Sequence, residues 1–217
     1  MVQYQVDPAS TLDKLDPVWA RLRAEAEDIV RREPELATFL YSAVLHHDRL
    51  EDAVIQRIAD RLDDASMPAD FIRQAYLDAL RGDPDLGNIF RADIVAVYDR
   101  DPAAHRFIDP VLYFKGFHAI QTHRLAHWLW NNGRRDFAYY LQSRASSVFQ
   151  TDINPAAKIG RGIFLDHATG LVVGETLFDV SGNRCKGCGL CRMHRPDRQH
   201  RPPELRFQRV ADRALGQ

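Results

Sequence analysis

Aliphatic side chains recur at every sixth residue over one segment of the chain, at Ile153, Ile159, Leu165, Leu171 and Leu177. A period of six matches neither the α-helix nor the β-strand. It is typical of a parallel β-helix, in which three hexapeptides make one triangular turn of the backbone. The next six-step positions are Asn183 and Gly189, so the ladder predicts fewer than two turns. That is too little to bury a continuous core alone.

The part of the chain before the ladder has the pattern of short amphipathic helices. Asp16 followed by Pro17 is the order expected where a helix begins, with a capping carboxylate and then proline at the first helical position. Apolar residues then recur at helical spacing, in the stripe Trp19, Leu22, Ala26 and Ile29. We therefore expect the first 150 residues to be all-α.

The change of period after residue 150 predicts an α + β chain of three parts. Residues 1–150 form an α-helical N-terminal domain, residues 151–178 form the first turns of a β-helix, and residues 179–217 form an irregular basic tail rich in Cys, Arg and Pro. Because the composition changes in the middle of a repeat, we hypothesise that a reading-frame change after codon 177 produced the tail.

The tail carries the three cysteines of the chain, Cys185, Cys188 and Cys191, followed at the same spacing by His194. Three thiolates and an imidazole suit zinc, and the spacing is similar to part of an iron–sulfur run, but the fourth cysteine of that run is absent. We expect no metal site and keep a metal-binding protein as an alternative. Residues 184–217 carry a net charge of +6 but lack interleaved aromatics, so we expect no nucleic-acid partner.

Several features of the chain predict a cytoplasmic protein without a membrane partner. No apolar run approaches the roughly 20 residues that span a bilayer. The first residues, MVQYQVDPAS, lack the basic-then-apolar order of a signal peptide. The cysteines are odd in number and crowded together, which does not suggest a secreted disulfide framework.

Two carboxylates and one imidazole lie within the ladder segment, on Asp152, Asp166 and His167. If three hexapeptides make one turn, Asp152 stacks on Gly170, close to His167, because successive rungs lie roughly 4.8 Å apart. A histidine oriented by a carboxylate is suited to take a proton from an alcohol. The pair therefore predicts acyl transfer to a hydroxyl group, although a polar histidine at the corner of a coil is more often simply solvated.

Three segments of the sequence are similar in order and spacing to serine O-acetyltransferases, which are hexapeptide-repeat acyltransferases. They are DIVAVYDRDPA from Asp93, KGFHAIQTHRLAHWLWNNGRR from Lys115 and TDINPAAKIGRGIFLDHATGLVVGET from Thr151, and the likeness covers about residues 10–177. The resemblance implies a helical domain joined to a left-handed β-helix, assembled as trimers or pairs of trimers. It also implies acetyl transfer from acetyl-CoA to L-serine, which gives O-acetylserine in cysteine biosynthesis.

The resemblance also implies roles for individual residues. His167 is expected to be the general base on the serine hydroxyl, with Asp152 as its orienting partner, and Asp93 and Asp166 are expected to contact bound serine. Acetyl-CoA is a co-substrate, no bound cofactor is expected, and no residue is assigned to the CoA site. The further coils that form much of the acetyl-CoA groove in this family have no counterpart after residue 177, so we expect CoA binding to be weakened or lost.

Two other interpretations remain open from the sequence. The helical domain mediates subunit contacts in the family, so the chain is alternatively a catalytically silent oligomerisation module. His123 and His127 have the spacing of helical zinc ligands, but without a third ligand we expect them to pack. The chain ends at Gln217 instead of the usual isoleucine, so we expect no complex with O-acetylserine sulfhydrylase.

Overall fold

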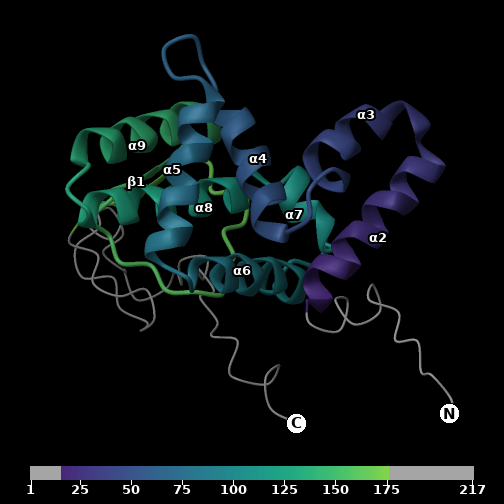
Figure 1. Cartoon of the computed structure of the whole chain (residues 1–217). Helices are drawn as coiled ribbons and strands as arrows, with labels where there is room; N and C mark the ends of the chain where they lie inside the picture. The colour runs from purple at the N-terminus through teal and green to yellow at the C-terminus, as the bar shows by residue number, and fades with distance from the viewer. Residues whose placement is uncertain (1–15, 176–217) are drawn as a thin grey trace, which may run out of the picture.

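The computed structural model describes residues 16–175 (Figure 1). Short turns of 3-10 helix at Pro34–Leu36 and of π-helix at Tyr41–Leu45 flank one of the helices. The helices of the described part are α2 (Pro17–Arg32), α3 (Ala37–Leu40), α4 (Leu50–Leu62), α5 (Ala69–Gly82), α6 (Leu86–Arg100), α7 (Ile108–Leu112), α8 (Lys115–Asn131) and α9 (Arg135–Phe149). Two short strands follow, β1 (Thr151–Ile153) and β2 (Leu171–Val173).

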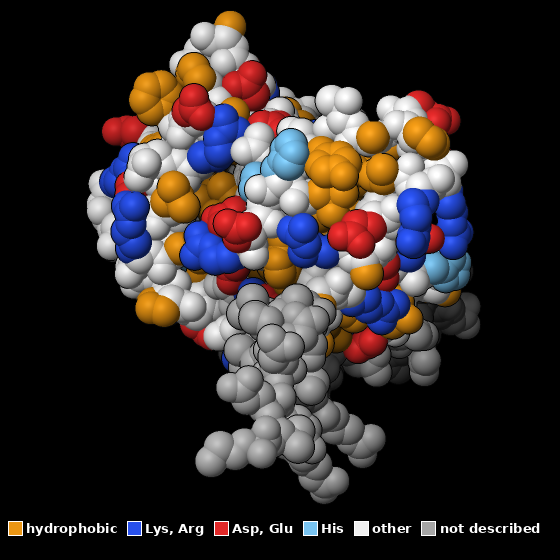
Figure 2. Space-filling model, turned by 45° about the vertical axis from the view of Figure 1, so that its right-hand side comes forward, with side chains coloured by type: hydrophobic (Ala, Val, Ile, Leu, Met, Phe, Trp, Pro, Cys, Tyr) orange, Lys and Arg blue, Asp and Glu red, His pale blue; other side chains and the backbone are white. Residues whose placement is uncertain are grey.

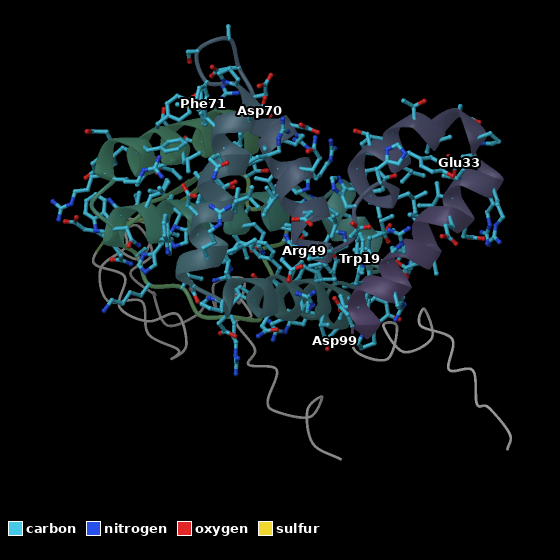
Figure 3. All side chains as sticks on the ribbon, viewed as in Figure 1. Trp19, Glu33, Arg49, Asp70, Phe71 and Asp99 are labelled. Atoms are coloured by element: carbon cyan, nitrogen blue, oxygen red, sulfur yellow. The ribbon has the colours of Figure 1, made fainter. Side chains whose placement is uncertain are left out.

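Helix α2 begins where the sequence predicts. The side chain of Asp16 accepts a hydrogen bond from the backbone N–H of Trp19 at 3.2 Å, and Pro17 occupies the first helical position. The predicted apolar stripe is buried, as Trp19, Leu22, Ala26 and Ile29. The Trp19 indole also donates to the backbone oxygen of Asp48 at 3.0 Å, on the side of α2 that faces the rest of the bundle (Figure 3).

Helix α8 lies at the centre of the bundle and packs most extensively against α9 (Figure 1). Gly133 lies between the two helices with a φ of 78°, a left-handed conformation that favours glycine. Unlike a surface helix, α8 buries polar side chains along with its apolar ones, namely His118, Gln121, Thr122, His123 and Arg124. Buried polar groups require partners, and several of these are found on the chain after residue 150.

Strands β1 and β2 pair in parallel, with Asp152 opposite Val172 and Ile153 opposite Val173. The turn between paired residues therefore takes two residues more than three hexapeptides supply. This corrects the prediction that Asp152 stacks on Gly170. Within this turn Gly162, His167, Ala168 and Gly170 have positive φ values.

A small second core lies under this turn of backbone. Its buried members are Ile120, Ile153, Ala157, Ile163 and Leu165, and Ile159 and Leu171 pack against them partly buried. The predicted ladder is confirmed as an apolar set at these positions, whereas Leu177 lies outside the described residues. The predicted fold class is confirmed at the level of a helical N-terminal part followed by a few strands, and the domain limits at 150 and 178 stay predictions.

The surface of the described residues is mixed in charge on the face that Figure 2 shows, where basic and acidic side chains alternate around small apolar groups. The electrostatic field over that face is therefore mixed in sign. Among residues 16–175, no helix is both long enough and apolar enough to cross a bilayer.

Candidate active site

His167 projects from the corner between the two strands. Its side chain is 86% exposed, and its Nε2 lies 3.6 Å from Oδ1 of the adjacent Asp166, which is also exposed. The backbone N–H of Ala168 donates to the backbone oxygen of Asp166, so the chain turns sharply at the histidine. The site therefore presents an imidazole and a carboxylate to solvent, side by side.

The corner is held by backbone contacts with the start of β1. The N–H of Gly170 donates to the backbone oxygen of Gln150 at 2.8 Å, and the N–H of Leu171 donates to that of Ala168 at 3.1 Å. The hydroxyl of Thr151 donates to the same Ala168 oxygen at 3.2 Å. These bonds fix the loop that carries His167 against the strand that carries Asp152.

Asp152 lies on β1 and is half-buried. Its Oδ1 accepts a hydrogen bond from the side-chain amide of Gln142 in α9 at 2.6 Å. Within residues 16–175, neither a hydrogen bond nor an ion pair joins Asp152 to His167, whose carboxylate neighbour is Asp166. The role of Asp152 as the orienting partner of His167 stays a prediction.

Asp93 lies inside the molecule with an exposed fraction of 0%. Its Oδ2 accepts from Nε and Nη2 of Arg124 at 2.9 and 2.7 Å and from the amide of Gln121 at 2.8 Å. Its Oδ1 accepts from the backbone N–H of Ile163 at 2.8 Å. Asp93 therefore links α6 to α8 and to the turn of backbone after β1, and its predicted contact with serine stays a prediction.

Arginine side chains bind backbone oxygens of the same turn. Arg124 Nη2 donates to Gly160 O at 2.9 Å and Nη1 donates to Ile159 O at 3.4 Å. From α6, Arg100 donates through Nη1 to Gly162 O at 2.9 Å. Burial lowers the pKa of Arg100, with Asp99 and Asp93 acting in the opposite direction.

The histidine pair of α8 contacts the preceding part of that turn. His123 Nε2 lies 3.1 Å from the backbone oxygen of Ala157, and His127 Nδ1 lies 2.7 Å from that of Pro155. Burial lowers the pKa of His123 to about 3, so its imidazole is neutral near neutral pH and donates one N–H. The expectation that this pair packs is confirmed by these contacts.

The described residues contain no group of three or more His, Cys, Asp or Glu side chains able to hold a metal ion. The cysteine motif of the tail lies outside the described residues. Sequence reasoning missed the contact of Arg124 with Asp93, the contact of Gln142 with Asp152, and the contact of Lys115 at the start of α8 with Thr169 in the His167 loop. A buried carboxylate requires a cation, but the burial of Asp93 is visible only in the structure, so the sequence alone does not point to Arg124.

The chain is similar in sequence to known proteins. A family model described as the N-terminal part of serine acetyltransferase matches residues 18–122. Serine acetyltransferase of Escherichia coli (strain K12) is 48% identical over 164 residues, which are 76% of this chain and 60% of that protein. The chain thus spans about 60% of the length of this curated relative.

Solved structures of serine acetyltransferases also resemble this chain, both in sequence and in fold. Serine O-acetyltransferase from Brucella melitensis is 61% identical with a TM-score of 0.74, and the match covers 76% of this chain and 68% of that one. Serine acetyltransferase from Brucella abortus strain S19, in complex with coenzyme A, is also 61% identical with a TM-score of 0.74, over 76% of this chain and 66% of that one. With such identity over most of its described length, the chain belongs to the serine acetyltransferase family.

Proposed function

We propose that the chain is an acyltransferase that moves an acetyl group from acetyl-CoA to the hydroxyl of L-serine, giving O-acetylserine and CoA. The observation that carries this proposal is the exposed imidazole of His167, beside the Asp166 carboxylate at 3.6 Å, on a loop within the segment from Thr151 whose sequence resembles the family. An exposed imidazole beside a carboxylate is suited to general base catalysis at neutral pH.

In the proposed reaction, His167 accepts the proton of the serine hydroxyl while that oxygen attacks the thioester carbonyl. The carbon–sulfur bond breaks, and the departing CoA thiolate receives the proton from the imidazolium. No covalent enzyme intermediate is required, because both substrates are held together in one complex. In this proposal Asp166 attracts the serine ammonium, and the exposure of its carboxylate beside His167 supports that role.

The two remaining carboxylates have different support. Asp152 lies on the strand next to the His167 loop. In this proposal its carboxylate gives up the hydrogen bond from the Gln142 amide and accepts one from the His167 imidazole instead, which orients the ring. The contacts of Asp93 support a role in positioning the turn of backbone around Ile163 instead of contact with serine. Both of its oxygens accept hydrogen bonds from the protein, and the side chain is fully buried.

We further propose that residues 151–178 begin a left-handed β-helix and that the chain forms homo-oligomers, as the family resemblance implies. Apolar side chains at the surface support self-association. Phe71, beside Asp70 in the first turn of α5, projects away from the bundle (Figure 3) and is 62% exposed, and Val172 on β2 is 52% exposed. Light scattering on the full chain measures the mass of the particle, and a monomer at high protein concentration contradicts the proposed self-association. The cytoplasmic location stays a prediction.

The test of the activity is the release of CoA thiol from acetyl-CoA by the purified full chain of verified mass, with and without L-serine. The proposal predicts release that depends on serine. The absence of serine-dependent release at high protein concentration contradicts it and favours the silent oligomerisation module. Stoichiometric zinc or iron in the same preparation, at about one per chain, favours the metal-binding alternative.

A further inference from the structure

The loop that carries His167 has an unusual backbone. His167, Ala168 and Gly170 have φ values of 47°, 54° and 75°. The left-handed region is unfavourable for residues that have a Cβ atom, and such residues keep it only where surrounding contacts hold it. The contacts around this loop therefore decide the direction in which the His167 imidazole points.

One of these contacts comes from the helical part of the chain. Lys115, the first residue of α8, donates from Nζ to Oγ1 of Thr169 at 2.5 Å and to Oε1 of Gln150 at 3.3 Å. Thr169 lies between Ala168 and Gly170, which have positive φ values, and Gln150 immediately precedes β1. A single ammonium group thus joins the loop to the strand beside it, through hydrogen bonds that its charge strengthens.

Gly116, the residue after Lys115, lies against the backbone just before the His167 loop. A Cβ atom on Gly116 would lie 2.0 Å from the backbone oxygen of Leu165, so the start of α8 rests directly against the backbone that leads into Asp166. The side chain of Lys115 reaches the loop from this fixed position. The start of α8 therefore contacts the chain both before and after His167.

We propose that Lys115 is a positioning residue for His167. Its ammonium holds Thr169 and Gln150 together, and this keeps the loop from His167 to Gly170 in the left-handed conformation that directs the imidazole. The claim rests on the proposed function only for the use of His167 as a base, whereas the conformational effect concerns contacts within the chain and is measurable without substrate.

The experiment uses the full chain labelled with ¹⁵N and ¹³C and compares four single variants and one double variant by NMR. Lys115→Met removes the donor and the charge, Thr169→Val removes the acceptor and keeps the charge, and Lys115→Arg keeps a cationic donor. Lys158→Met is the control, because Lys158 is an exposed lysine of the same turn of backbone. The ring signals of His167 are assigned by their loss in His167→Gln.

We expect Lys115→Met and Thr169→Val to move the ring signals of His167 in the same direction, and to accelerate hydrogen exchange of the Gly170 amide about fivefold, the effect of losing one hydrogen bond. In the double variant, Lys115→Met with Thr169→Val, the second substitution adds little to the effect of Lys115→Met, because both remove the same hydrogen bond between Lys115 and Thr169. Lys115→Arg restores the wild-type signals, and Lys158→Met leaves them unchanged.

Two outcomes overturn the proposal. If Lys115→Met moves the His167 signals and Thr169→Val does not, the hydrogen bond from Lys115 to Thr169 does not direct the imidazole, and the lysine acts through its charge or through Gln150. If neither variant moves the His167 signals while the rest of the spectrum remains that of a folded protein, the loop keeps its conformation without the contact to Lys115. Should Lys115→Met fail to fold, Thr169→Val decides the question by itself. A chain without acetyltransferase activity leaves every one of these signals measurable, so failure of the proposed function is distinguished from failure of this inference.

Discussion

Asp93 and Arg124 form a buried ion pair in which one carboxylate oxygen receives two guanidinium N–H groups, at 2.9 and 2.7 Å. The other oxygen of Asp93 receives the backbone N–H of Ile163, and Arg124 binds the backbone oxygens of Ile159 and Gly160. The pair thus attaches the helical bundle to the turn of backbone that leads to His167.

Asp93→Asn is expected to lower the free energy of unfolding by about 3 kcal/mol, because it leaves the Arg124 charge buried without its counter-ion. Urea denaturation followed by tryptophan fluorescence measures the change. Asp70→Asn is the matched control. Asp70 pairs with Arg73 but its side chain is 84% exposed, and the expected change is below about 1 kcal/mol. An Asp93→Asn variant of unchanged stability with a raised KM for serine supports substrate contact instead.

The buried histidines predict that the chain loses stability in mild acid. Burial lowers the pKa of both His118 and His123 to about 3. Above about pH 6.5 these imidazoles are neutral in both states. As the pH falls from there toward 3, the two histidines become protonated in the unfolded chain but stay neutral in the folded chain. Each histidine therefore costs roughly 2 kcal/mol of stability at pH 5.

The pH prediction is checked by comparing urea denaturation at pH 8 and pH 5. His123→Gln is expected to reduce the difference between the two pH values by roughly 2 kcal/mol, the share of one histidine. His46→Gln, which alters an exposed histidine, leaves the difference unchanged. An equal loss of stability at pH 5 in wild type and His123→Gln contradicts the burial argument.

Gly116→Ala is expected to destabilise the chain by about 2 kcal/mol or more, because the new methyl group would overlap the backbone oxygen of Leu165 and backbone gives way less readily than a side chain. Gly160→Ala is the control, since a Cβ atom there meets nothing within 4 Å. Its expected change lies within about 0.5 kcal/mol. Equal melting temperatures for the two variants argue against close contact between α8 and Leu165.

Asp152→Asn tests the orienting role that the family resemblance implies. If Asp152 turns from Gln142 to His167 during the reaction, the substitution lowers kcat for serine-dependent acetyl transfer about a hundredfold. Gln142→Leu removes the amide that occupies Asp152 in the structure and is expected to leave kcat within about threefold. A larger loss in Gln142→Leu than in Asp152→Asn assigns the catalytic importance to the amide contact instead.

Part of this structure follows from local sequence alone. The start of α2 at Asp16 and Pro17 and the apolar ladder around Ile153 and Leu165 can be read from neighbouring residues, although Asp16 also binds Arg91 and the ladder also packs against Ile120. These features are visible because cap chemistry and periodicity are local properties of a chain.

Other features depend on contacts between distant residues. The register of Asp152 opposite Val172 was not predicted, and the sequence does not mark the left-handed backbone of His167 and Ala168 within the same turn, because neither is glycine. The burial of Asp93 depends on Arg124, 31 positions away. A carboxylate in a family-like motif looks the same in the sequence whether it faces a substrate or a buried guanidinium.

The most direct measurement is the formation of O-acetylserine from ¹³C-acetyl-CoA and L-serine, followed by NMR with the full chain, His167→Ala and His46→Ala. The proposed role of His167 predicts product from the wild type and from His46→Ala, and a rate at least about a hundredfold lower for His167→Ala. Equal rates for His167→Ala and wild type, or no product from any of the three proteins, would contradict it.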